Sequence, residues 1–305
     1  SWRIEFLQKE KEGFWPKGWV IADDQIDFTK PDFSSEKHEG KLEFGFDPKT
    51  GELVSLKSGV LFKTELLKEP FTIDVYRAPS QNEPNQKKLW NKAGAFAPSK
   101  KLVDFSDVAE NGLRKVKSVI DYGMTGTVYR VETEWSIRNG VAEVKAKFTQ
   151  LGKKFEPARI GFRTVFDFGN MNVQWLGNGP YENYSDRRSG AFLGLWSKKS
   201  KDFFFPYDVP QDSGNMEGTY FVKLDTLWDS VTFAATGKPF AYEVNPYAPE
   251  VLVRYAHPAE LPGSSTTFFG IYARVRGLGG NSCGPLPIAR DIVGSESHEI
   301  EFVIK

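Results

Sequence analysis

Residues 127–150 read TVYRVETEWSIRNGVAEVKAKFTQ, and apolar and polar residues alternate on both sides of the turn signal Arg138-Asn139-Gly140. Alternation with a period of two places apolar side chains on one face of a strand and polar side chains on the other. The stretch therefore predicts two β-strands, each with one buried face, joined by a turn.

The same alternation recurs along the chain between turn signals such as DPKTGE, LGNGP and LPGSS, in the segments WRIEFLQ, LEFGFD, RIGFRTVFDF, FFGIYARV and HEIEFVIK. Aromatic residues make up 14% of the chain, which suits pleated sheets. Only residues 85–94 predict a helix, a short one with Leu89 and Ala93 as its apolar pair and Gly94 as its C-terminal cap. With so few helices to cover them, the strands must pack sheet on sheet. We therefore predict an all-β protein, a large antiparallel β-sandwich.

The chain has 305 residues, with 40 basic and 40 acidic side chains and a formal net charge of zero. This balance removes the attraction that nucleic acid or an anionic membrane would need, so we expect neither partner. No apolar run reaches the roughly 18 residues that span a bilayer, and no signal peptide opens the chain, which predicts a soluble protein, cytoplasmic or periplasmic. The single cysteine, Cys283, excludes an intrachain disulfide and a zinc site built from cysteines.

The first 30 residues differ from the rest, because they predict two consecutive strands that cannot bury both faces by themselves. A polar segment with Pro and Ser follows at residues 31–37 and is typical of a linker. We expect residues 1–30 to be the last hairpin of a preceding β domain and residues 38–305 to form the large sandwich.

The segment GPYENYSDRRSG, residues 179–190, places Glu182 and Asp186 close together. A pair of carboxylates is what glycoside hydrolysis requires. Arg187 and Arg188 follow at once, however, and a neighbouring cation lowers a carboxyl pKa, whereas a general acid needs a raised one. A structural clamp therefore explains the segment better than a catalytic pair.

Two other polar segments could bind a sugar or serve structure alone. The loop 205–221 carries Gln211, Asp212, Ser213 and Asn215, which could bond a sugar or their own backbone through Asx-type turns. In residues 76–86, Arg77 and the polar turn that contains Asn82 and Glu83 could line a groove or form a buried ion pair. For the loop, the structural interpretation is favoured.

Residues 276–287 read RGLGGNSCGPLP and join two predicted strands through four glycines, which permit close approach of another chain or of a ligand. No βαβ unit surrounds them, so a dinucleotide site is not indicated. We interpret Cys283 as a plain loop thiol and the scattered His38, His257 and His298 as structural histidines.

Taken in order, these segments resemble the C-terminal (small-chain) domain of bacterial β-galactosidases of glycoside hydrolase family 2. The resemblance covers residues from about 38 to the C-terminus. It is carried by YRAPSQNE, KAG, PARIG, WLGNGPYENYSDRRSGAFLGLW, FPYDVPQDSGNMEGT and GLGGNSCGP. The long GPYENYSDR stretch is its most specific part.

The resemblance implies a galactose-mutarotase-like supersandwich, preceded by the closing strands of an immunoglobulin-like domain. It also implies that the catalytic glutamates lie on an upstream TIM barrel, so no catalytic residue is expected in this chain. The signature loop residues Glu182, Tyr184, Asp186 and Arg187 would then be structural. No metal or other cofactor is expected here, although parent enzymes often use Mg and Na elsewhere; the parent domains, a carbohydrate substrate and a possible homo-oligomer are the implied partners.

The resemblance also implies that one loop reaches the aglycone side of the active site, where the family places a stacking tryptophan. The matching residues here are Gly280, Asn281, Ser282 and Cys283, so that Cys283 stands in place of the tryptophan in a segment one residue shorter.

Two alternatives remain open. One is a freestanding aldose 1-epimerase-like enzyme with His257 as the general acid. The other is a carbohydrate-binding module with exposed aromatic residues, although Trp175 and Trp196 lie within apolar alternation and favour the core.

Overall fold

The structure is a computed structural model that describes residues 2–26, 41–59, 63–280 and 287–305. Backbone contacts divide the chain into two compact units, Ser1–Phe33 and Ser34–Lys305. In the first unit, β1 (Trp2–Leu7) pairs antiparallel with β2 (Val20–Ile26), as the sequence predicted. The assignment of this hairpin to an immunoglobulin-like domain stays a prediction, and the predicted linker lies outside the described residues.

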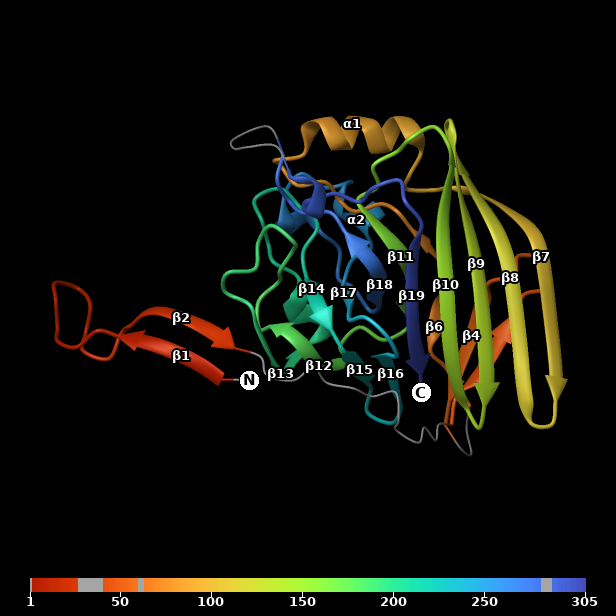
Figure 1. Ribbon diagram of the computed structural model, residues 1–305, viewed down its shortest axis with the longest axis horizontal. Coiled ribbons are helices and arrows are strands. Elements are labelled where there is room, and N and C mark those ends of the chain that lie inside the picture. Colours follow the sequence, from red (N-terminus) through yellow and green to blue (C-terminus); the bar gives the residue numbers. More distant parts are fainter. Residues whose placement is uncertain (1, 27–40, 60–62, 281–286) are drawn as a thin grey trace. The chain divides into compact units, whose positions relative to one another are not determined.

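Over the described ranges, the second unit forms a nine-stranded and an eight-stranded antiparallel sheet (Figure 1). The nine-stranded sheet has the order β13-β12-β15-β16-β19-β10-β9-β8-β7. Its strands are β7 (Ser99–Glu110), β8 (Leu113–Met124), β9 (Thr127–Arg138), β10 (Val141–Gly152), β12 (Asn172–Gly179), β13 (Phe192–Lys199), β15 (Phe221–Asp225), β16 (Ser230–Ala235) and β19 (His298–Ile304).

The eight-stranded sheet has the order β14-β17-β18-β11-β6-β4-β3, with β5 paired to β4. Its strands are β3 (Glu43–Phe46), β4 (Leu53–Ser58), β5 (Thr64–Glu65), β6 (Leu67–Asp74), β11 (Arg159–Phe166), β14 (Asn215–Thr219), β17 (Phe240–Asn245) and β18 (Thr267–Val275). Short 3₁₀ turns span Ser200–Phe203, Pro258–Glu260 and Ala289–Asp291.

The hairpin β9–β10 follows from its sequence. Asn139 and Gly140 both have positive φ, 51° and 71°, as a tight two-residue hairpin turn with right-handed twist requires. Alternate side chains of both strands are buried, in β9 Tyr129, Val131, Thr133 and Trp135 and in β10 Ala142, Val144, Ala146 and Phe148. The predicted pair of half-buried strands is confirmed.

The core lies between the two sheets and is rich in aromatic rings. Phe71 of the eight-stranded sheet stacks on Phe162 at 4.9 Å between ring centroids and faces Phe233 and Phe302 of the nine-stranded sheet at 6.5 and 6.4 Å. Trp175 is also buried in this core. The predicted all-β, antiparallel sandwich is therefore confirmed, because its two sheets share one core.

Helix α1 (Pro84–Ala93) lies across one end of the sandwich (Figure 1), and Gly94 ends it in the left-handed conformation at φ 72°. Of the predicted apolar pair, Ala93 is buried as expected, but Leu89 is 42% exposed. Trp90, which is fully buried, takes the place predicted for Leu89. The indole of Trp90 donates to the Glu156 carbonyl at 2.9 Å, which fixes this face inward. The four-residue helix α2 (Pro249–Leu252) was not predicted.

Candidate functional site

The predicted aglycone segment is described only in part. Asn281, Ser282 and Cys283 lie outside the described residues, whereas Gly280 is described and buried. Residues 276–280, here called the glycine-rich loop, leave the end of β18 and lead into that segment. The contacts of the glycine-rich loop therefore determine where the segment starts.

Asp186 of the signature segment holds the glycine-rich loop directly. Its carboxylate accepts the main-chain N–H of Leu278 at 3.0 Å and that of Gly279 at 2.7 Å. A Cβ on Gly277 would lie 2.5 Å from the carboxyl carbon of Asp186, so only glycine permits this approach. Hydrogen bonds from N–H groups to a carboxylate are charge-assisted and strong.

Glu182 is also engaged as an acceptor. It receives hydrogen bonds from Arg187 at 2.8 Å, from the hydroxyl of Tyr207 and from the main-chain N–H of Gly214 at 3.0 Å. The backbones of Tyr184 and Arg187 also bond each other in both directions. The two carboxylates thus bind different parts of the protein, Glu182 its neighbouring loop and Asp186 the glycine-rich loop.

A second segment holds the glycine-rich loop from the side of α1. Arg77 donates to the carbonyls of Arg276 and Gly277 at 2.6 and 2.7 Å, and Arg276 donates to the carbonyls of Gly277 and Gly279 at 3.0 Å each. Glu83 pairs with both guanidinium groups, at 2.5 and 3.0 Å. The sequence left two interpretations open for Arg77 and Glu83, the lining of a groove and a buried ion pair. The structure shows the buried ion pair.

The charged network continues into the core. The hydroxyl of Tyr184 donates to Asp212 at 2.9 Å, and the fully buried Arg159 lies 3.2 Å from Asp212 and 2.9 Å from Asp74. Arg159 also pairs with Glu243. Burial raises the pKa of Glu243 well above its ordinary value despite the opposing charge of Arg159, which favours a protonated Glu243.

A family profile described as "Beta galactosidase small chain" matches residues 38–304. The chain belongs to this family. A beta-galactosidase of Halalkalibacterium halodurans is 25% identical over 99% of this chain and 29% of its own length. One of Actinobacillus pleuropneumoniae is 24% identical over 88% of this chain and 26% of its own length. The chain thus spans a little over a quarter of the length of those relatives.

Solved structures match this chain at low sequence identity and with TM-scores below 0.5. A galactose mutarotase-like protein from Lactobacillus casei matches with a TM-score of 0.48 and 12% identity, over 88% of this chain and 98% of its own. A GH36 α-galactosidase from Geobacillus stearothermophilus matches with a TM-score of 0.41 and 9% identity, over 88% of this chain and 39% of its own.

The polar side chains of the small chain's 205–221 loop are buried. The amide oxygen of Gln211 accepts from the main chain of Gln81, and Asn215 donates to the Asn183 carbonyl at 2.7 Å. The hydroxyl oxygen of Ser213 accepts a hydrogen bond from the side-chain amide of Asn245 at 3.2 Å. Ser213 also accepts from the main-chain N–H of Phe205 in its own loop at 3.3 Å, whereas Gln211 and Asn215 join neighbouring segments to the loop.

Sequence reasoning missed Arg159 on β11 and Glu243 on β17, and it missed Arg276, which directly follows β18. The carboxylates that pair with Arg159, and Arg159 itself as the partner of Glu243, lie far away in the sequence. The available signal was a charge within a strand that is buried on both faces, because such a charge requires a partner. His257 is exposed and precedes a 3₁₀ turn. The carboxylate of Glu260 in that turn accepts a hydrogen bond from the main-chain N–H of His257 at 3.2 Å.

Among the described residues no group of three or more His, Cys, Asp or Glu is placed to hold a metal. Every helix in these residues is too short or too polar to traverse a membrane.

Proposed function

We propose that this chain is the non-catalytic C-terminal portion of a β-galactosidase and that its glycine-rich loop presents residues 280–283 to the aglycone side of the active site. In this proposal, terminal β-D-galactosyl residues are hydrolysed with retention on a TIM barrel elsewhere in the polypeptide. The sandwich stabilises that enzyme and shapes one side of its substrate pocket.

One observation carries the proposal. The glycine-rich loop is held through its main chain by Asp186 and by Arg77, two residues that lie far apart in the sequence and belong to two of the segments that carry the family resemblance. Contacts to the main chain fix the path of a loop whatever its side chains are. Such rigid support is what a loop needs if it is to place a substrate contact within a fraction of an ångström.

The residues that the sequence singled out for the two alternatives do not support them. His257 is exposed, and the carboxylate beside it, Glu260, bonds main-chain N–H groups as a cap instead of facing a substrate space. Trp175 is buried and Trp196 packs against the core, so neither offers a face to a sugar. Measurable acceleration of galactose anomer exchange by this chain would nevertheless reopen the first alternative.

Asp186→Asn in the full-length polypeptide is expected to lower kcat/KM about tenfold for substrates with a bulky aglycone. The asparagine keeps one acceptor oxygen for two N–H donors, and a hydrogen bond to a charged group contributes about 1.5–3 kcal/mol. The ratio of kcat/KM between lactose and a small-aglycone galactoside should fall. Thermal unfolding should change little, because Asp186 is exposed.

Asp208→Asn is the matched control, an exposed carboxylate on the neighbouring 205–221 loop. It should leave the ratio of the two substrates unchanged. An Asp186→Asn enzyme with the same ratio as the control would contradict the proposed role of the loop. Hydrolysis of a chromogenic galactoside by residues 1–305 alone would contradict the non-catalytic assignment.

A further inference from the structure

A cleft of about 920 Å³ opens between strands of the two sheets, and no residue of the glycine-rich loop lines it. It is lined by residues of β14, β17 and β18 of one sheet and of β12 and β19 of the other, and Phe240 is among them. Binding clefts for small ligands enclose about 300–1,000 Å³, so a mono- or disaccharide would fit.

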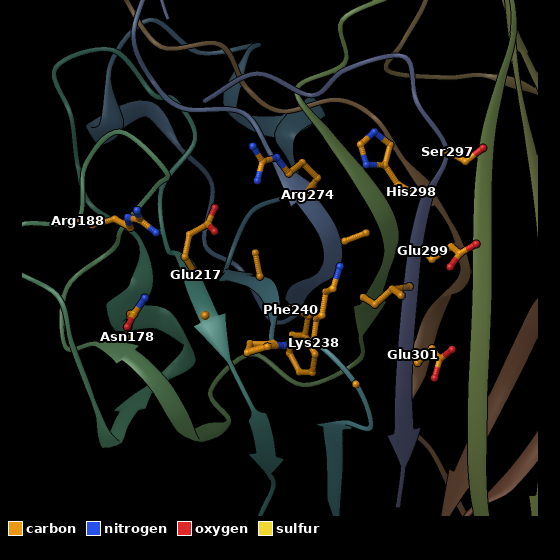
Figure 2. Close-up of a pocket in the computed structure, with 16 residues that line it drawn as sticks. Asn178, Arg188, Glu217, Lys238, Phe240, Arg274, Ser297, His298, Glu299 and Glu301 are labelled. Atoms are coloured by element: carbon orange, nitrogen blue, oxygen red, sulfur yellow. The ribbon is translucent and has the colours of Figure 1, made fainter. Parts of the chain in front are cut away.

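The cleft gathers cations from three separate segments. Figure 2 shows the side chains of Arg188 and Arg274 extending toward Glu217 from two sides, with Lys238 rising from below. Among the described residues, none of these three cations forms an ion pair within 4.0 Å. Arg274 is oriented by a hydrogen bond to the carbonyl of Arg290. Its guanidinium keeps further donors for a ligand.

Glu217 is the one acidic side chain that points into this group of cations in Figure 2. Its Oε1 is buried without a hydrogen-bond partner, which costs free energy unless a ligand supplies one. Burial raises the pKa of Glu217 to about 7, although Arg274 and Arg188 oppose the shift. A carboxyl with this pKa can donate its proton to an acceptor on a ligand at neutral pH.

We propose that this cleft binds a saccharide that carries a carboxylate, such as a uronic acid. The carboxylate would accept hydrogen bonds from Arg188 and Arg274, which suit planar bidentate recognition, and Lys238 would add a point charge. The protonated Glu217 donates to the same ligand, so its buried oxygen gains a partner. The charges of the cleft are the reason for proposing a ligand with a carboxylate. That the ligand is a carbohydrate rests on the proposed function.

The cleft also has acidic neighbours, of which Asp186 acts on the charge of Glu217 but is already bonded to the main-chain N–H groups of Leu278 and Gly279. Glu299 and Glu301 also lie on β19, but their side chains point away from Glu217 in Figure 2, and Glu301 pairs with Lys145 at 3.6 Å. His298, on the same strand, has its ring nitrogen 3.2 Å from the Gly294 carbonyl. A ligand carboxylate would therefore meet more donors than acceptors.

The test is a calorimetric titration of residues 1–305 with D-galacturonate and with D-galactose, which differ only in the carboxylate. Galacturonate should bind saturably and more tightly than galactose, and added salt should weaken it. Arg188→Ala and Lys238→Ala should each weaken galacturonate binding about tenfold, as the loss of one charge-assisted contact predicts. Both side chains are exposed, so these variants should fold normally.

Arg254→Ala is the matched control, because Arg254 is an exposed arginine that lines a different cavity, beside α2. Absence of saturable galacturonate binding overturns the proposal, as does equal binding of galactose or an equal loss in the Arg254→Ala control. The titration involves no hydrolysis, so its failure would leave the Asp186→Asn experiment standing. A failure of that experiment would equally leave the cleft intact.

Discussion

Replacing Arg159 with methionine is expected to destabilise the small chain by about 3–5 kcal/mol, because removing one partner of a buried ion pair leaves uncompensated charge in the core. Arg159 is fully buried and contacts three buried carboxyl groups, those of Asp74, Asp212 and Glu243. Natural domains are stable by only about 5–15 kcal/mol, so much of the folding free energy would be lost. Urea unfolding followed by tryptophan fluorescence measures the change.

Arg130→Met is the matched control, since Arg130 also lies on a strand and pairs with one carboxylate, Asp121, at 2.8 Å. That pair lies at the surface and is only partly buried, and pairs that water reaches contribute little to stability. The urea midpoint of the control should therefore stay close to that of the wild type. Equal midpoint shifts in the two variants would contradict the view that the Arg159 cluster is a stabilising centre of the fold.

The sandwich could be predicted because the long strands β8, β9 and β10 each have one exposed and one buried face. In β9 and β10 the alternation of apolar and polar residues is visible in the sequence of residues 127–150. Other strands carry a weaker signal. β7 is exposed along nearly its whole length as the edge of the nine-stranded sheet, and β17 is buried at every position, so neither alternates.

The site could be predicted only where its parts are neighbours in sequence. The cluster of Glu182, Asp186 and Arg187 was visible within a few residues, as were Arg77 and Glu83. That Arg77 reaches the Arg276 carbonyl was not visible, because 199 residues separate them. The apolar pattern of a strand sets its register but does not reveal which distant loop completes the hydrogen bonds at its end.

Gly280→Ala is expected to lower kcat/KM of the full-length polypeptide about a hundredfold, the loss that a displacement of about 1 Å at a substrate contact can cause. A Cβ on Gly280 would lie 1.8 Å from the carbonyl oxygen of Asn82, so one of the two backbones must move. The turn at Asn82 is fixed by the buried Glu83, which pairs with Arg77 and Arg276. The glycine-rich loop will therefore shift and carry the aglycone segment with it.

Gly190→Ala separates displacement of the loop from the general effect of adding a methyl group. Gly190 ends the signature segment, is exposed, and has nothing within 4 Å of an added Cβ. The control should keep wild-type kcat/KM, whereas Gly280→Ala should also lose discrimination between aglycones, measured with a series of galactosides that share one glycone. If Gly280→Ala unfolds at the wild-type temperature and retains full discrimination, the glycine-rich loop does not shape the substrate pocket. If it lowers kcat/KM equally for every aglycone, the loop acts on the glycone side instead.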